Sequence, residues 1–182
     1  MTWAIWLTGL PGSGKSTIVK ELEKLLSEKG ISAEVLSMDQ VRKQLTPEQK
    51  YDANERKIAY AALVDIGKQK YDQGINIIFD ATAHKQSFRD YAREKIENFK
   101  EIYIKCNLKT AMQREANRKS NLVVSNLYQK ALKRLEGEKV ELMGEMIGID
   151  VPYEEPLSPE LTIDAEMTTP EDAAKKILEL VK

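Results

Sequence analysis

A short segment near the start of the chain has the residue types and the spacing of a phosphate-binding loop. It fits the pattern G-x-x-x-x-G-K-[ST] at every fixed position and reads Gly9-Leu10-Pro11-Gly12-Ser13-Gly14-Lys15-Ser16. A polyphosphate is held by many backbone N–H groups that point inward, and glycines allow the backbone conformations that this requires. Lys15 supplies a positive charge for the β- and γ-phosphates, and Ser16 offers a hydroxyl group to Mg²⁺. The segment therefore predicts nucleotide binding.

The residues on either side of this loop argue against the alternative, a turn that contains Gly-Lys-Ser by chance. Ala4 to Thr8 is a short apolar run typical of a buried strand. Thr17 to Lys29 then carries apolar residues at the spacing of one helix face, and a helix that starts here directs the positive end of its dipole at an anion. The expected nucleotide-binding residues are Gly9, Pro11, Gly12, Ser13, Gly14, Lys15, Ser16 and Thr17, with Ser16 also at the metal.

Two aspartates follow apolar strands farther along the chain. Asp39 comes after the strand predicted over Ala33 to Leu36, and Asp80 closes the strand predicted over Ile75 to Phe79. Ligands of open parallel sheets bind at the carboxyl ends of the strands. Asp80 either orients Mg²⁺ or accepts a proton from a substrate hydroxyl group, or it caps the following turn. Both aspartates are candidate catalytic residues, and the choice of base between them stays open.

Two arginines lie on a charged helix predicted over Leu108 to Lys119. Arg114 and Arg118 are four residues apart and hence on one face of that helix. In a phosphoryl-transfer enzyme such a pair closes over the nucleotide and neutralises charge on the transferred group. In the alternative interpretation the two arginines pair with glutamates on a solvated helix. The segment Ser120 to Ser125 looks mobile, and we expect a lid around residues 114–147.

Strands and helices alternate along the whole chain. Besides the strands already named, strands are predicted over Glu101 to Cys106 and Leu161 to Ile163, and helices over Asp52 to Tyr71, Phe88 to Asn98 and Pro170 to Val181. This alternation after a phosphate loop implies a mainly parallel sheet that is covered on both faces. We therefore expect an α/β fold, a three-layer α/β/α sandwich with a five-stranded sheet. No linker-like tract divides the chain, so a single domain is expected over residues 1–182.

Several side chains are given a structural role rather than a chemical one. The expected buried face of the helix over Asp52 to Tyr71 consists of Ile58, Ala62, Leu63 and Ile66. Glu55 and Lys57 are expected on its solvated face. His84, the single histidine, is expected in a solvated loop, and Cys106 is expected to be a small core side chain.

The composition limits the class of partner. The chain has 28 Lys and Arg against 29 Asp and Glu, a formal net charge of −1. This balance argues against an extended nucleic-acid footprint and against an anionic membrane surface. The first residues lack the basic region of a signal peptide, and no apolar run approaches the length of a membrane span. The one cysteine cannot form an internal disulfide, which fits a reducing compartment. We expect a cytoplasmic protein with a small-molecule substrate.

Several stretches together resemble the adenylylsulfate (APS) kinase family. They are the phosphate loop, D-Q-V-R-K-Q-L at Asp39, the helix around Arg56, N-L-Y-Q-K-A at Asn126, and G-I-D-V-P-Y-E-E-P with P-E-L-T-I-D between Gly148 and Asp164. The last pair is the most diagnostic, because a phosphate loop alone is generic. The resemblance implies a P-loop kinase that transfers the γ-phosphoryl group of ATP, with Mg²⁺, to the 3′-hydroxyl group of adenosine 5′-phosphosulfate. It also implies a homodimer.

The resemblance implies roles for individual residues. Lys15 and Ser16 would hold phosphate and Mg²⁺. Asp39 and Arg42 match the last acid and the arginine of the family's D-G-D-x-x-R motif, which contacts the acceptor or activates its hydroxyl group. The other matches are a substrate-binding arginine, a nucleotide-side arginine and a lysine of the lid, at Arg56, Arg114 and Lys130. The implied substrate-binding residues are Asp39, Arg42, Arg56 and Lys130.

Some positions depart from the family pattern. Ser37 replaces the first Asp of D-G-D, and Ala59 stands where a substrate-binding Asn is expected. Met146 occupies the position of an aromatic residue that stacks on the adenine of the acceptor. The family's F-I-S-P-Y-R segment here runs from Asp80 to Gln86, with no arginine at the aligned place. These departures leave the ATP half intact and cluster in the acceptor half.

Two alternatives for the function stay open. In the first, the same fold acts on another small alcohol or on a nucleic-acid end, and the D-A-T sequence at Asp80 resembles P-loop kinases outside the sulfate pathway. In the second, the chain is a nucleotide-binding regulatory switch without an acceptor. Against the switch, the sequence has no N-K-x-D motif for guanine, and the acids at two strand ends suit an acceptor pocket.

Overall fold

Five parallel strands form the centre of the computed structural model, which describes residues 1–45, 53–117, 128–131, 133, 137–138 and 145–181. The strands are β1 (Ala4–Thr8), β2 (Ala33–Ser37), β3 (Asn76–Asp80), β4 (Phe99–Lys105) and β5 (Leu161–Asp164). Their order in the sheet is β2-β3-β1-β4-β5. Because every neighbouring pair is parallel, the carboxyl ends of the strands lie at the same edge of the sheet.

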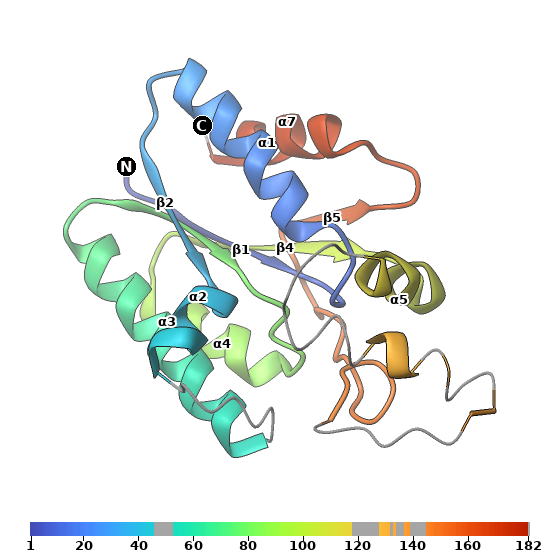
Figure 1. Ribbon diagram of the computed structural model, residues 1–182. Coiled ribbons are helices and arrows are strands. Elements are labelled where there is room, and N and C mark those ends of the chain that lie inside the picture. Colours follow the sequence, from blue (N-terminus) through green and yellow to red (C-terminus); the bar gives the residue numbers. More distant parts are fainter. Residues whose placement is uncertain (46–52, 118–127, 132, 134–136, 139–144, 182) are drawn as a thin grey trace.

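Helices cover both faces of this sheet (Figure 1). The helices α1 (Lys15–Glu28) and α7 (Pro170–Val181) pack against each other on one face. The helices α3 (Ala53–Asp72) and α4 (Gln86–Lys95) cover the other face. Two shorter helices, α2 (Met38–Leu45) and α5 (Leu108–Ala116), follow β2 and β4 at the carboxyl edge of the sheet. This arrangement confirms the predicted three-layer α/β/α sandwich.

The residues of β1 show why both faces are covered. Ile5 and Leu7 belong to the apolar cluster that α1 and α7 complete, whereas Ala4 and Trp6 belong to the cluster with α3 and α4. All four side chains are fully buried. A strand that is buried on both sides has no polar face, which is why its sequence reads as a continuous apolar run.

The second of these clusters also holds the loop that leaves β3. The ring of Trp6 stacks on Phe79 at a centroid distance of 4.9 Å, and its Nε1 donates a hydrogen bond of 2.9 Å to the carbonyl oxygen of Ala81. The Tyr60 hydroxyl group accepts a hydrogen bond of 2.8 Å from the backbone N–H of Ala83. Buried Trp and Tyr side chains usually pair their polar atoms. Here the partners are backbone groups, so the core fixes the path of this loop.

The predicted bounds agree with the structure at β1 and at α7 and differ at α4. This helix begins at Gln86 and ends at Lys95, two residues earlier at its start than the predicted Phe88. Ile96, its C-cap, already has an extended backbone, and β4 begins at Phe99. The prediction over Phe88 to Asn98 was therefore wrong at its end, because the turn before β4 carries no glycine or proline to mark it.

The buried face of α3 differs from the predicted one. Ile58 is 53% exposed, whereas Glu55 is 7% exposed, the reverse of both predictions. Lys57 is exposed, as predicted. The reason is that α3 packs against α2 as well as against the sheet, and Glu55 pairs there with Arg42. The position of a charged residue along its own helix does not show whether it faces solvent or pairs with a residue of another helix.

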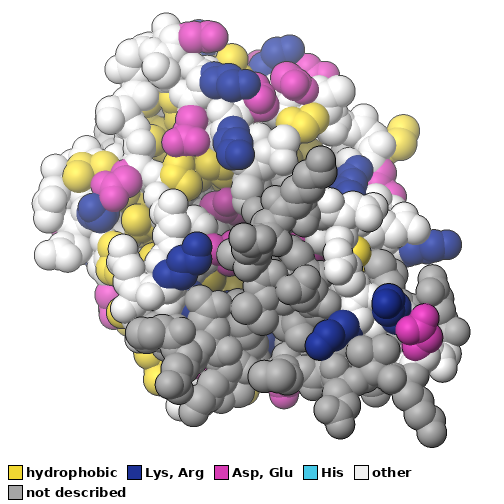
Figure 2. Space-filling model, in the orientation of Figure 1, with side chains coloured by type: hydrophobic (Ala, Val, Ile, Leu, Met, Phe, Trp, Pro, Cys, Tyr) yellow, Lys and Arg dark blue, Asp and Glu magenta, His cyan; other side chains and the backbone are white. Residues whose placement is uncertain are grey.

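Charges of both signs are interspersed on the surface that Figure 2 shows, and neither sign forms a continuous patch there. Within the described part of the chain, no helix combines the length and the apolar character needed to cross a membrane. Cys106 is buried, as the sequence predicts.

Candidate active site

The phosphate loop joins the end of β1 to the start of α1. Lys15, the first residue of α1, is 8% exposed, and its ammonium group donates hydrogen bonds of 2.9 Å to the carbonyl oxygens of Gly9 and Leu10. A longer contact of 3.5 Å leads to the hydroxyl group of Ser13. The loop therefore curls around the lysine, and the N-terminus of α1 adds its positive dipole end to the same place.

Close packing requires two of the glycines in this loop. A Cβ atom on Gly9 would collide with the carbonyl oxygen of Ile104 in β4, and one on Gly12 would collide with the carbonyl oxygen of Ala111 in α5. Backbone oxygens cannot move aside as a flexible side chain can. The loop is thus seated directly against β4 and α5.

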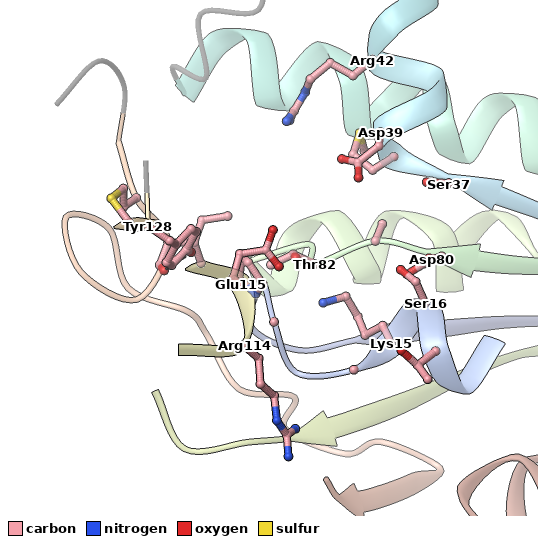
Figure 3. Close-up of a pocket in the computed structure, with 18 of the residues that line it drawn as sticks. Lys15, Ser16, Ser37, Asp39, Arg42, Asp80, Thr82, Arg114, Glu115 and Tyr128 are labelled. Carbon is pink, nitrogen blue, oxygen red and sulfur yellow. Dashed lines mark hydrogen bonds between the residues drawn. The ribbon is translucent and has the colours of Figure 1, made fainter. Parts of the chain in front are cut away.

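A cavity of about 480 Å³ opens beside the loop (Figure 3). Small-molecule sites are typically ~300–1,000 Å³. Its walls come from the loop, from the ends of β2 and β3, from α2, α3 and α5, and from residues 145–147. The predicted site residues that line it are Pro11, Gly12, Gly14, Lys15, Ser16, Thr17, Asp39, Arg42, Arg56, Asp80 and Arg114. Residues predicted from distant stretches of the sequence thus share one cavity.

The two aspartates follow neighbouring strands. Ser37 pairs with Asp80 in the register of β2 and β3, and Asp39 lies just beyond Ser37, in the first turn of α2. Figure 3 shows the side chains of Asp80 and Ser16 together beside the first turn of α1, with Asp39 on the α2 side of the same cavity. Both carboxylates therefore line the same cavity.

Ser16 and Asp80 carry oxygen atoms of the kind that Mg²⁺ prefers. Mg²⁺ prefers oxygen ligands and usually takes one or two protein groups together with substrate phosphates and water. Both residues line the cavity next to the phosphate loop. The part of the chain that the structure describes has no group of three or more His, Cys, Asp or Glu residues that could hold a metal ion by itself.

Two arginines supply positive charge to the wall formed by α2 and α3. The Nε atom of Arg42 lies 3.1 Å from Oε1 of Glu55, and both side chains are less than a tenth exposed. Arg56, 3% exposed, donates from Nη1 to Oε2 of Glu145 at 3.1 Å and from Nη2 to the carbonyl oxygen of Glu145. Charged groups are rarely buried without a partner. Each of these arginines has one.

Arg114 lines the cavity, but its guanidinium group points away from Lys15 (Figure 3). Nη1 lies 3.9 Å from the sulfur of Cys106, and Nη2 donates to the carbonyl oxygen of Ala165 at 3.3 Å. The side chain is therefore held beside the loop that follows β5.

Most of the predicted lid over 114–147 lies outside the described residues. Arg118 and the segment Ser120 to Ser125 also lie outside the described residues. Lys130 is described and is exposed on a helical turn at residues 128–131. Its predicted contact with a substrate stays a prediction.

His84 is buried, and the prediction of a solvated loop residue was wrong. The side chain is 3% exposed, its ring packs edge-on against Phe88 at 5.6 Å, and its carbonyl oxygen accepts a hydrogen bond of 2.8 Å from the backbone N–H of Glu154. Burial, together with the positive charge of Arg56, lowers the pKa of His84 to about 4. The histidine is therefore neutral at pH 7. Nothing local in the sequence signals that a distant segment folds over this loop.

Arg89 of α4 clamps the same loop from the side of the sheet. It is fully buried, and its Nε atom lies 2.5 Å from Oε1 of Glu101 in β4. Its other nitrogens donate to the carbonyl oxygens of Ala83 and Glu154 and to the side chain of Gln86. One guanidinium group thus joins β4, the loop after β3 and the segment around Glu154.

Sequence reasoning did not identify several residues that line the cavity, among them Tyr60, Glu115, Tyr128 and Glu145. Tyr128 lies within the stretch N-L-Y-Q-K-A that carries part of the family resemblance, so that stretch could have identified it. The other three stand in runs of ordinary helix or loop residues. Two of the departures from the family pattern, Ser37 and Met146, also line the cavity.

Comparisons with known proteins agree on one family. The family model described as adenylylsulphate kinase matches residues 1–164. The adenylyl-sulfate kinase of Thermodesulfovibrio yellowstonii is 36% identical over 183 residues, which cover 100% of this chain and 84% of that protein. A probable adenylyl-sulfate kinase of Archaeoglobus fulgidus is 33% identical over 166 residues, which cover 91% of this chain and 97% of that protein.

The solved structures that match include a member of this family and a more distant kinase. The structure of an APS kinase from Mycobacterium tuberculosis in complex with AMPPNP and APS matches with a TM-score of 0.80 and 28% identity, covering 99% of this chain and 97% of that one. A shikimate kinase from Acinetobacter baumannii, in complex with shikimate, matches with a TM-score of 0.60 and 17% identity, covering 100% and 93%. At that identity the likeness shows a shared fold alone.

Proposed function

Because the chain belongs to the adenylylsulphate kinase family, we propose that it transfers the γ-phosphoryl group of ATP to the 3′-hydroxyl group of adenosine 5′-phosphosulfate. One observation carries the proposal. The family match over residues 1–164 takes in every wall of the cavity, from the phosphate loop to residues 145–147.

The nucleotide half of the cavity binds ATP through the phosphate loop. Lys15 exchanges its two loop carbonyl partners for phosphate oxygens, and the backbone N–H groups at the start of α1 donate to the same anion. Ser16 and Asp80 hold Mg²⁺, which when bound supplies positive charge to the phosphates.

The acceptor half positions the attacking hydroxyl group. Arg42 and Arg56 bind the charged part of the acceptor, and Asp39 or Asp80 accepts the proton of the hydroxyl group as the phosphoryl group is transferred in line. Positioning and charge neutralisation supply most of the catalysis in such a reaction.

The test is release of ADP in a coupled assay with ATP, Mg²⁺ and adenosine 5′-phosphosulfate, against a reaction without acceptor. We expect a rate that depends on the acceptor. A rate no higher than the acceptor-free blank, with ATP binding intact, would contradict this acceptor.

Lys15→Ala is the matched variant for this assay. It removes the positive charge at the transferred phosphoryl group, so we expect kcat to fall by about 100-fold or more. The melting temperature should stay close to that of the wild type, because close packing of Gly9 and Gly12 against β4 and α5 also holds the loop in place. Phosphoryl transfer at the wild-type rate would contradict the assignment of Lys15.

A different acceptor is the second candidate, and Met146 favours it. This residue is 2% exposed and lines the cavity where the family resemblance expects an aromatic ring to stack on adenine. A thioether side chain offers less stacking area than a ring. Screening of small alcohols and nucleic-acid ends by ATP consumption tests this candidate.

The same proposal includes the compartment and the assembly. We place the reaction in the cytoplasm, which the single cysteine supports, and we expect a homodimer and a single domain with a lid around residues 114–147. Sedimentation of the purified protein tests the oligomeric state.

A further inference from the structure

Arg56 and Glu145 meet across the wall of the cavity. Arg56 comes from α3 and Glu145 from the segment that precedes Gly148, and both line the cavity. The guanidinium group contacts Glu145 twice, through the carboxylate at 3.1 Å and through the backbone carbonyl oxygen. Two parallel donors on one side of a guanidinium group are the arrangement that also binds sulfate and phosphate oxygens.

The partner of Arg56 differs from the partner of Arg42 in its exposure. Glu55, the partner of Arg42, is 7% exposed and is enclosed between α2 and α3. The side chain of Glu145 is 48% exposed, although Arg56 beneath it is only 3% exposed. Glu145 can therefore turn into water at small cost, whereas Glu55 cannot. Of these two buried arginines, Arg56 is the one whose partner a ligand can replace.

The backbone beyond Glu145 is fixed independently of this ion pair. The N–H of Met146 donates to the side chain of Asp150 at 2.9 Å, and the N–H of Gly148 donates to the carbonyl oxygen of Val151 at 2.7 Å. The Tyr128 hydroxyl group donates to the carbonyl oxygen of Ile147 at 2.9 Å. Departure of the Glu145 carboxylate from Arg56 thus leaves this turn in place.

The charge of Arg56 reaches the surrounding side chains. It contributes to lowering the pKa of His84, and it opposes the rise of pKa that burial causes at Tyr60 and Tyr128. These residues come from three separate parts of the chain. The charge of Arg56 is therefore felt by groups on several elements around the cavity.

We propose that the carboxylate of Glu145 occupies the subsite of the acceptor's anionic group, and that the acceptor must displace it to bind. The inference rests on the proposed function, in which Arg56 binds the charged part of the acceptor. It makes Glu145 a specificity-determining residue. An acceptor with a sulfate or phosphate group replaces the carboxylate on Arg56, whereas an uncharged alcohol cannot.

Glu145→Gln tests this role by steady-state kinetics. The variant keeps the shape of the side chain and removes its charge, so the KM for adenosine 5′-phosphosulfate should fall by about three- to tenfold, as expected for loss of a partly exposed ion pair. Both kcat and the KM for ATP should stay unchanged. Glu34→Gln is the matched control, because Glu34 of β2 is 41% exposed and pairs with Lys70 of α3, and neither residue lines the cavity.

A binding measurement separates this inference from the identity of the acceptor. Inorganic sulfate is titrated into the protein with AMPPNP and Mg²⁺ in excess, so that the phosphate loop is filled, and the melting temperature is followed. Glu145→Gln should bind sulfate about three- to tenfold more tightly than the wild type, and Arg56→Met should abolish the response. Glu145→Ala is the second variant and should act in the same direction if Glu145→Gln fails to fold.

The outcomes distinguish the two proposals. Suppose that the wild type does not turn over adenosine 5′-phosphosulfate, but Glu145→Gln binds sulfate more tightly and Arg56→Met gives no response. The proposed acceptor is then wrong, and the role of Glu145 stands. If turnover is normal but neither Glu145 variant changes the KM or the sulfate affinity, the role of Glu145 is overturned. A raised KM in these variants would also overturn it, since Glu145 would then assist acceptor binding.

Discussion

Asp39 and Asp80 are chemically alike, but they face different neighbours in the cavity. Asp80 ends β3 beside Ser16 and the phosphate loop, whereas Asp39 lies in the first turn of α2, on the side of Arg42 (Figure 3). The first position suits a magnesium ion that is shared with phosphate, and the second suits a proton acceptor at the substrate hydroxyl group.

Asparagine substitutions test this division of roles. Asp39→Asn should lower kcat by about 10²- to 10⁴-fold even at saturating Mg²⁺, because a neutral amide does not accept the proton. Asp80→Asn should instead raise the Mg²⁺ concentration needed for half of the maximal rate. A magnesium titration of both variants measures the two effects. The opposite pattern would assign the base to Asp80.

His84 makes the stability of the fold depend on pH. Its pKa is about 4 in the folded protein, against 6.5 in its ordinary state, because the site is buried. Well above pH 6.5 both states are neutral and the full stability is present. As the pH falls from 6.5 toward 4, the unfolded chain takes up a proton that the folded chain does not, so stability is lost.

The variant for comparison is His84→Gln, whose side chain does not titrate in this range. Between about pH 7.5 and about pH 5, the free energy of unfolding of the wild type should fall by about 2 kcal/mol more than that of the variant. Urea unfolding at the two pH values measures it. Equal losses in both proteins would show that His84 is not held neutral in the folded state.

At the scale of the elements, Arg89 connects parts that the sheet alone does not. It holds β4 through Glu101 and also holds the loop after β3 and the segment around Glu154. Arg89→Lys keeps the charge but loses the planar fork that serves several partners at once. Because the single ammonium group leaves at least one buried carbonyl oxygen without its donor, which costs about 1–3 kcal/mol, we expect a loss of stability of about that size.

Thermal unfolding measures this loss, and Arg93→Lys is the control on the same helix. Arg93 also contacts Glu101, at 3.6 Å, but its side chain is 37% exposed. The control should therefore lose much less stability than Arg89→Lys. If the two variants melt at the same temperature, Arg89 does not act as the clamp of this loop.

The bounds of some elements could be predicted from the sequence, whereas the burial of several single residues could not. The apolar run of β1 and the periodic α7 have the bounds that were predicted, because burial on both faces and a 3.6-residue period are local signals. Glu55, Ile58 and His84 were predicted wrongly. Their burial is decided by partners on other elements, and no spacing within one segment encodes that.

At the scale of the whole molecule, the strand order brings the site together. The chain passes from β1 to β2 and β3 on one side of the sheet and returns to β4 and β5 on the other. Ligands of such sheets bind where the strand order reverses, at the carboxyl ends. The phosphate loop leaves β1 at this point, and the cavity lies there with residues from both halves of the chain.

This geometry explains which half of the site could be predicted. The phosphate loop is one continuous segment, and its chemistry requires certain residue types at fixed spacing. Its residues were therefore identified from the sequence. The acceptor side is assembled from α2, α3 and the segment before Gly148. The contact between Arg56 and Glu145 joins residues that are distant in the sequence, and a single sequence does not show such a pair.

The clamp formed by Arg89 has a consequence for how this enzyme can evolve. In the loop after β3 and in the segment around Glu154, Arg89 holds the carbonyl oxygens of Ala83 and Glu154. Every amino acid has such an oxygen, so exchange of the half-buried Thr82 side chain, which lines the cavity, leaves both acceptors in place. Mutations can alter what the loop presents to an acceptor while the scaffold beneath it persists. Selection for a new substrate can therefore act on this loop without first rebuilding the protein.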